Sequence, residues 1–156
     1  MFSNQTRPKS GLRRKVAAVA GATALLVGAG VATAATASAG PNCASGYHCV
    51  FYNGLGEPGG HAFYNSDPDF TDNTFDGMSI NINDNVWAAS NSSNGGYESH
   101  YYYDVNYGGG LVFCVNPGSA VNYDRLSDDG VNGNHVGQRD EASSLLMRPS
   151  TTVSCF

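Results

Sequence analysis

The sequence predicts an all-β domain. Tyr, Phe and Val dominate its apolar segments, and Gly, Asn and Asp are frequent between them, with 20 Gly and 9 Tyr in 156 residues. Aromatic and β-branched residues favour strands, while Gly, Asn and Asp favour turns. No window shows sustained helical periodicity. An internal repeat and four cysteines further constrain the arrangement of the strands.

The first 39 residues are predicted to be a signal peptide. A basic region precedes an uncharged stretch rich in Ala, Gly, Val and Leu (16–36), and Ala37-Ser38-Ala39 has the small-x-small cleavage pattern. A membrane anchor is the alternative, because the stretch is about long enough to span a bilayer. Its weak hydrophobicity and the cleavage pattern favour a signal peptide. Arg13-Arg14 raises a twin-arginine route, but the residues after the pair match poorly, so we expect the general secretory route. We therefore expect a secreted domain of residues 40–156, with no membrane insertion after processing.

Processing makes the chain strongly acidic. The mature part keeps all 13 acidic residues but only three basic ones, all arginines, so its formal net charge is −10. Phosphate binding needs clustered Lys and Arg, so nucleic acid is not an expected partner. Solubility outside the cell accounts for the charge.

The cysteines indicate two disulfides, because an exported domain with an even number of cysteines normally pairs them. Three pairings are possible. The local choice joins the first two cysteines and leaves the last two as a long-range pair, and the loop-entropy model gives these bonds roughly 2 and 4 kcal/mol. None of the spacings is typical of a zinc site. The four residues are Cys43, Cys49, Cys114 and Cys155.

The sequence matches itself after a shift of 50 positions, so that residues 50–64 lie over 100–114. Each copy has an aromatic strand, a Gly-rich turn and a second short strand, which predicts a β-hairpin. The paired glycines at 59–60 and 109–110 predict backbone with positive φ.

A polar loop (65–77 and 126–134) and a shorter apolar segment (78–89 and 143–147) follow each hairpin. The acidic stretch 67–72 lacks the spacing of an EF-hand and is predicted to be a solvated loop. Two four-strand units, about 46–90 and 97–148, would pack face to face and bury their aromatic faces.

Three motifs carry a family resemblance: CASGYHC (43–49), YDVNYGGGL (103–111) and DEASSL (140–145). Together with the export signal they resemble the βγ-crystallin superfamily, and within it the secreted bacterial metalloproteinase inhibitors of peptidase inhibitor family I36. The resemblance implies a βγ-crystallin-like double Greek-key sandwich. It also implies a monomeric, non-enzymatic inhibitor whose partner is a secreted, thermolysin-like metalloprotease.

The resemblance also implies a reactive bond. In inhibitors that this chain resembles, a Cys–Val bond within a Cys-Val-x-x-x-Cys loop is presented to the target protease. The matching segment here, CVNPGS (114–119), keeps Cys and Val but has Ser119 in place of the second cysteine. The valine would supply the bulky apolar residue after the scissile bond, and the cysteine carbonyl would approach the protease zinc. Proline would stiffen the loop. The structural alternative is a half-cystine at the edge of the core beside a core valine. The predicted inhibitory loop is Cys114, Val115, Asn116 and Pro117.

The crystallin-like fold often holds calcium through Asn/Asp-Asn/Asp-x-x-Ser/Thr-Ser, a set of oxygen ligands that suits this ion. NDNVWA (83–88) lacks the two hydroxyls, and RDEASS (139–144) places a cation, Arg139, where an oxygen ligand is expected. The alternative is that the serines only hydrogen-bond neighbouring turns. No cofactor is expected beyond one weak Ca²⁺ site formed from Asp84, Asp140 and Ser143.

Two other functions stay open beside the inhibitor. One is a calcium-binding or structural crystallin-like extracellular protein. The other is a glycan-binding or antimicrobial module that uses the aromatic row HYYYDVNY (100–107), of which about half should face outward. No serine lies in a nucleophile elbow, so an enzyme is not expected. The four histidines lack metal-site spacing and are interpreted as surface or edge residues: His48, His61, His100 and His135.

Overall fold

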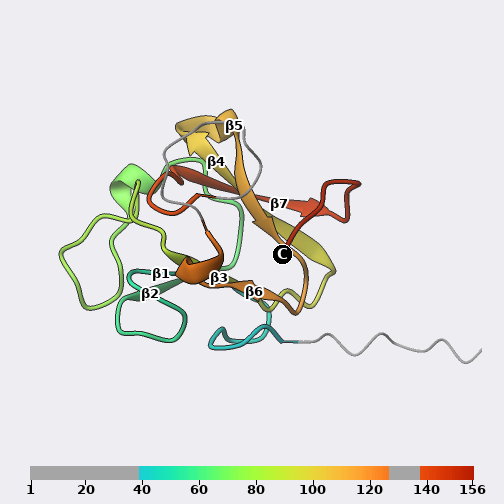
Figure 1. Ribbon diagram of the computed structural model, residues 1–156, viewed down its shortest axis with the longest axis horizontal. Helices are drawn as coiled ribbons and strands as arrows, with labels where there is room; N and C mark the ends of the chain where they lie inside the picture. Colours follow the sequence, from blue (N-terminus) through green and yellow to red (C-terminus); the bar gives the residue numbers. More distant parts are fainter. Residues whose placement is uncertain (1–38, 127–137) are drawn as a thin grey trace, which may run out of the picture. The chain divides into compact units, whose positions relative to one another are not determined.

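The computed structural model describes residues 39–126 and 138–156 (Figure 1). The described part is all-β, with two antiparallel sheets, short 3-10 turns and no α-helix. The predicted signal peptide, except Ala39, lies outside the described residues, and so do most of the predicted loop 126–134 and His135.

The first sheet has the order β2-β1-β3-β6. Its strands are β1 (His48–Phe51), β2 (Gly60–Phe63), β3 (Ala88–Asn91) and β6 (Ala120–Val121). The β1–β2 hairpin is the first of the two predicted from the repeat. Strand β6 comes from the second half of the chain and pairs with β3, with Val121 opposite Ala89.

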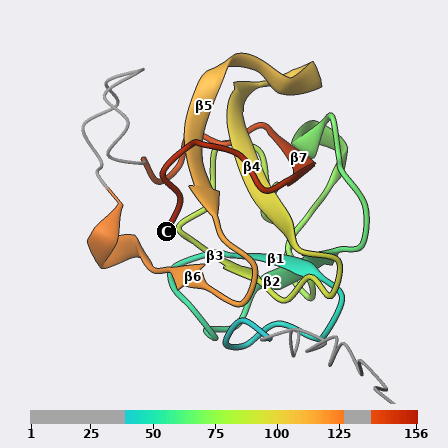
Figure 2. The same cartoon turned by 90° about the vertical axis from the view of Figure 1, so that its right-hand side faces the viewer.

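The second sheet has the order β5-β4-β7 and forms a separate layer in Figure 2. Its strands are β4 (Tyr97–Asp104), β5 (Gly108–Val115) and β7 (Ser144–Pro149). The β4–β5 hairpin is the second predicted hairpin. Asp67, from the first half of the chain, exchanges two backbone hydrogen bonds of 2.8 Å with Leu145 of β7. Each half therefore contributes a segment to the sheet of the other.

One hydrophobic core joins the two sheets. It contains buried side chains from both layers, among them Val50, Phe63, Ala89, Tyr101, Val112, Phe113, Val115 and Leu145. Of the glycines predicted to have positive φ, Gly59 (+94°), Gly109 (+70°) and Gly110 (+95°) do so. A Cβ at Gly59 would lie 2.6 Å from the end of the Met78 side chain, which is flexible and can shift, so the positive φ is the reason that this turn favours glycine.

In the acidic stretch 67–72, predicted to be a solvated loop, the acidic side chains are at least partly exposed, but Phe70 points into the core, as does Phe75 just after the stretch. Phe70 and Phe75 are completely buried in the core, and the Phe70 ring stacks on Phe63 with 5.1 Å between centroids. The acidic side chains satisfy the local turn: Asp69 accepts a hydrogen bond of 2.9 Å from the Thr71 amide at the start of the 3-10 helix Phe70–Asp72. The carboxylates thus hold the turn in a shape that points the aromatic rings inward.

Two disulfides are present, Cys43–Cys49 and Cys114–Cys155. Of the three possible pairings, this is the one that joins the first two cysteines to each other and the last two to each other. The second bond spans 41 positions and ties strand β5 to residue 155.

Candidate functional site around the Cys114–Cys155 disulfide

The predicted reactive bond lies at the end of strand β5. Cys114 pairs with His100 and Val115 with Ser99 of the neighbouring strand β4. Both residues are buried, with 2% of Cys114 and none of Val115 exposed, and the valine side chain belongs to the core. The structure therefore places this bond inside the sheet and not in a projecting loop.

The segment Val153–Phe156, here called the C-terminal arm, covers the outer edge of β5. The Phe156 amide donates to the Cys114 carbonyl (3.0 Å), and the Asn116 amide donates to the Phe156 carbonyl (2.8 Å). On the inner side, Asn91 Nδ2 donates to the Val115 carbonyl (3.0 Å). Both carbonyls beside the predicted bond thus have partners, and a protease reaches the bond only if the arm moves away.

The rest of the predicted loop forms a tight turn. The Ser119 amide donates to the Asn116 carbonyl (3.0 Å), Pro117 occupies the second position, and Gly118 has φ +76°. A Pro-Gly pair with this geometry is typical of a type II turn. Further backbone bonds join Gly118 and Ser119 to Asn91 of β3 at 2.8 and 2.9 Å. Hydrogen bonds to β3 thus hold the turn although position 119 has no cysteine.

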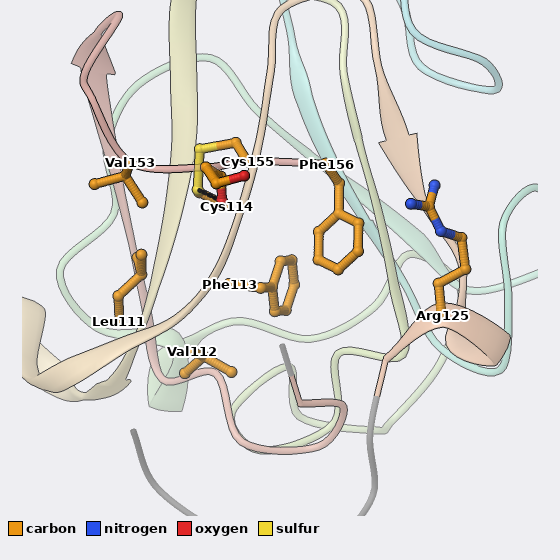
Figure 3. Close-up of a pocket in the computed structure, with 9 residues that line it drawn as sticks. Leu111, Val112, Phe113, Cys114, Arg125, Val153, Cys155 and Phe156 are labelled. Atoms are coloured by element: carbon orange, nitrogen blue, oxygen red, sulfur yellow. Dashed lines mark hydrogen bonds between the residues drawn. A yellow bond between two sulfur atoms is a disulfide. The ribbon is translucent and has the colours of Figure 1, made fainter. Parts of the chain in front are cut away.

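Residues of β5 and of the arm line a largely apolar pocket of about 570 Å³ (Figure 3). Leu111, Val112 and Phe113 line it from β5, the disulfide lies at one end, and Arg125 and Phe156 close another side. The Arg125 guanidinium lies 5.0 Å from the centre of the Phe156 ring. This cation–π contact helps to hold the arm in place.

A buried polar pair lies beside the disulfide. His100 Nε2 lies 2.8 Å from Glu98 Oε2, and Thr151 donates to the same carboxylate from its amide (2.9 Å) and its hydroxyl (2.8 Å). Burial raises the pKa of Glu98, but the hydrogen bonds from His100 and Thr151 outweigh it, so the net pKa is lowered. The sulfurs near His100 belong to a disulfide, so they are not thiolate ligands for a metal.

The histidine prediction is therefore wrong for two residues, because both His48 and His100 are buried. The aromatic row 100–107 is partly exposed, at residues 104–106, in agreement with the prediction that about half of it faces outward. Tyr101 is completely buried and stacks on Phe113 with 4.5 Å between centroids, and Tyr103 packs partly against the core. The row thus contributes its first tyrosine, Tyr101, to the core and does not present it to a glycan.

The structure brings together two residues of the predicted calcium site, Asp84 from the first copy of the pattern and Ser143 from the second. Ser143 Oγ donates to Asp84 Oδ1 (2.9 Å), and Asn83 Nδ2 donates to Asp84 Oδ2 (2.6 Å). Asn83 Oδ1 is buried without a hydrogen-bond partner among the described residues. Asn83, Asp84 and Ser143 thus gather the hard oxygen atoms that calcium prefers.

The second copy does not fit a cation. Asp140 matches Asp84 in backbone geometry, with φ +63° against +54°, and its amide donates to Val86 as that of Asp84 donates to Ala142. However, the Arg139 guanidinium lies 4.7 Å from the centre of the Trp87 ring. A positive charge and an indole thus stand where this copy would need oxygen ligands.

No known protein family, curated protein or solved structure matches this chain. Within residues 39–126 and 138–156, no helix has the length and apolar character needed to cross a membrane. The two disulfides are consistent with an extracellular protein.

Proposed function

We propose that the mature chain is a secreted inhibitor of a thermolysin-like metalloprotease, built on a double Greek-key fold of the βγ-crystallin type. The fold proposal is supported by the repeated hairpins and by the exchange of segments, β6 into the first sheet and Asp67 onto the second. The sequence resemblance provides the class of target.

The observation that carries the proposal is that the Cys114–Val115 bond is anchored on both sides. Cys114 is tied by its disulfide to Cys155, and Val115 is held by its pairing with Ser99 and by the core. If a protease cut this bond, both new ends would stay in place and gain little conformational freedom. The cut chain would then leave the protease slowly, which distinguishes an inhibitor from a substrate.

In this mechanism the C-terminal arm acts as a cover. When Phe156, the residue beyond the tethered Cys155, moves away, the Cys114 carbonyl and the Asn116 amide on the outer edge of β5 lose their partners, and a protease cleft can add to that edge as a further strand. The apolar pocket beside Leu111 would receive a side chain from the cleft. The fraction of open molecules limits the apparent affinity, because only the open state binds.

Phe156→Pro tests this mechanism. Proline lacks the amide that donates to the Cys114 carbonyl, so the arm loses a hydrogen bond of about 1 kcal/mol and opens about fivefold more often. The inhibition constant against thermolysin should therefore fall about fivefold, as measured by enzyme titration. Phe156→Leu lacks the ring beside Arg125, as the proline variant does, but keeps the amide; it is the matched control, and the proline variant should inhibit about fivefold more tightly than it does. If the proline variant is less stable but inhibits no better, the arm does not gate this bond.

A second candidate is a calcium-binding crystallin-like extracellular protein. It is favoured by the Asp84–Ser143 contact and by the partnerless Asn83 Oδ1. Calcium at ten times its dissociation constant should raise the melting temperature by about 5 °C. Asp84→Asn should abolish this shift, and Asp140→Asn, in the copy that does not fit a cation, should preserve it. An equal shift with magnesium, or one that survives Asp84→Asn, would contradict this candidate.

A further inference from the structure

Exposed tyrosines gather at one place on the described surface. Tyr47, Tyr64 and Tyr97 are 36%, 67% and 44% exposed, and they make up half of the six large exposed apolar residues. The rings of Tyr47 and Tyr64 meet edge to face, with 5.5 Å between centroids. Tyr97 lies over the backbone of Gly95, where an added Cβ would be 2.9 Å from the ring. These rings are therefore held in position by their neighbours and still accessible.

Two of these tyrosines line a pocket of about 520 Å³, here called the tyrosine pocket, within the range of about 300–1,000 Å³ common for small-molecule sites. It lies where β1, the segment after β2, the loop between β3 and β4, and β7 meet. Its other lining residues are mostly small and polar: Ser45, Gly46, His48, Asn65, Ser66, Ser93, Asn94, Gly95 and Met147.

The polar lining is neutral. The pocket has no lysine, arginine or carboxylate. Its one titratable base, His48, is buried against Ser99, and this burial lowers the pKa of His48 to about 4. The imidazole is therefore uncharged at neutral pH. A charged ligand would find no counterion here, and an anionic one would also meet a mature chain of net charge −10.

The pocket also offers hydrogen-bonding groups. Ser45 Oγ donates to Asn94 Oδ1 (2.9 Å), which fixes the orientation of this amide. Asn94 Nδ2 has no hydrogen-bond partner in the part of the chain that the structure describes, and neither does the exposed side chain of Asn65. Amides of this kind donate to and accept from hydroxyl groups.

We propose that the tyrosine pocket binds a neutral oligosaccharide. The rings of Tyr64 and Tyr97 stack on the apolar faces of the sugars, and Asn94 and Asn65 hydrogen-bond their hydroxyls. Accessible aromatic rings, neutral amides and the lack of charge together match this chemistry. The site differs in position from the aromatic row 100–107 and from the disulfide site, so it does not depend on protease inhibition.

Isothermal titration of the exported protein with cellotetraose and with tetra-N-acetylchitotetraose tests the proposal, with a hyaluronan tetrasaccharide as the anionic comparison. At least one neutral tetrasaccharide should bind, and the anionic one should not. Tyr64→Ala and Tyr97→Ala should each weaken binding about tenfold, the loss typical of an aromatic anchor. Tyr123→Ala is the matched control, because Tyr123 is 43% exposed but lies outside the pocket against Trp87, and it should bind like the wild type.

The tyrosines are exposed, so these variants should keep the wild-type melting temperature, which confirms that any loss is local. The proposal is overturned if neither neutral tetrasaccharide binds, if hyaluronan binds as tightly, or if both pocket variants bind like the wild type. If this face instead binds a partner protein, titration with either neutral tetrasaccharide should show no heat of binding, which would also overturn the proposal.

Discussion

Replacement of both Cys114 and Cys155 by Ala should lower the free energy of unfolding by about 4 kcal/mol. The bond closes a loop of 41 positions, and the loop-entropy model assigns it about twice the contribution of the local Cys43–Cys49 bond, which spans six. It also fixes the C-terminal arm over a buried face of the second sheet. Urea denaturation at 25 °C without reductant measures this loss of unfolding free energy.

The double variant Cys43→Ala/Cys49→Ala is the control, with an expected loss of about 2 kcal/mol. Equal losses for the two pairs would contradict the assigned role of the long-range bond. They would indicate that the backbone bonds of Phe156 and the Glu98–Thr151 contacts hold the arm without it.

Phe70→Ala should lower the free energy of unfolding by about 3–5 kcal/mol, the usual range for removing a buried phenylalanine. The ring is completely buried and stacks on Phe63, so its removal leaves a cavity between the two sheets. Thermal or urea denaturation measures the loss.

Tyr64→Ala is the comparison for Phe70→Ala, because Tyr64 precedes the same polar stretch but is 67% exposed. Its effect should stay within about 0.5 kcal/mol. A small loss for Phe70→Ala would mean that the stretch is the solvated loop that the sequence suggests and that the ring is not part of the core.

The sequence predicted the parts of the fold that depend on local patterns. The two hairpins follow from the aromatic alternation and the glycine turns, which repeat after 50 positions. It did not predict the two exchanged segments, because β6 has only two residues and Asp67 lies in a stretch without strand pattern. The burial of Phe70 was missed for a related reason: isolated aromatic residues among Asp and Asn give no periodic signal.

The candidate site was harder to predict because strand β4 is covered on both faces. Alternation normally indicates one buried and one solvated face, and Glu98 and His100 alternate with the core residues Ser99 and Tyr101. The disulfide and the residues around Thr151 cover the second face, so all four side chains are buried. Only the pairing of Cys114 with a C-terminal cysteine indicated that a distant segment reaches this strand.

The most direct test of the proposed function titrates thermolysin with the predicted mature chain, residues 40–156, and identifies the bound chain by mass spectrometry. The proposed mechanism predicts that protease activity falls to zero at one inhibitor per enzyme. It also predicts that the complex contains the chain either intact or cut once, between Cys114 and Val115. Full protease activity in the presence of excess protein, or rapid degradation at other bonds, would show that Cys114–Val115 is a structural part of the core and that the protein is not this kind of inhibitor.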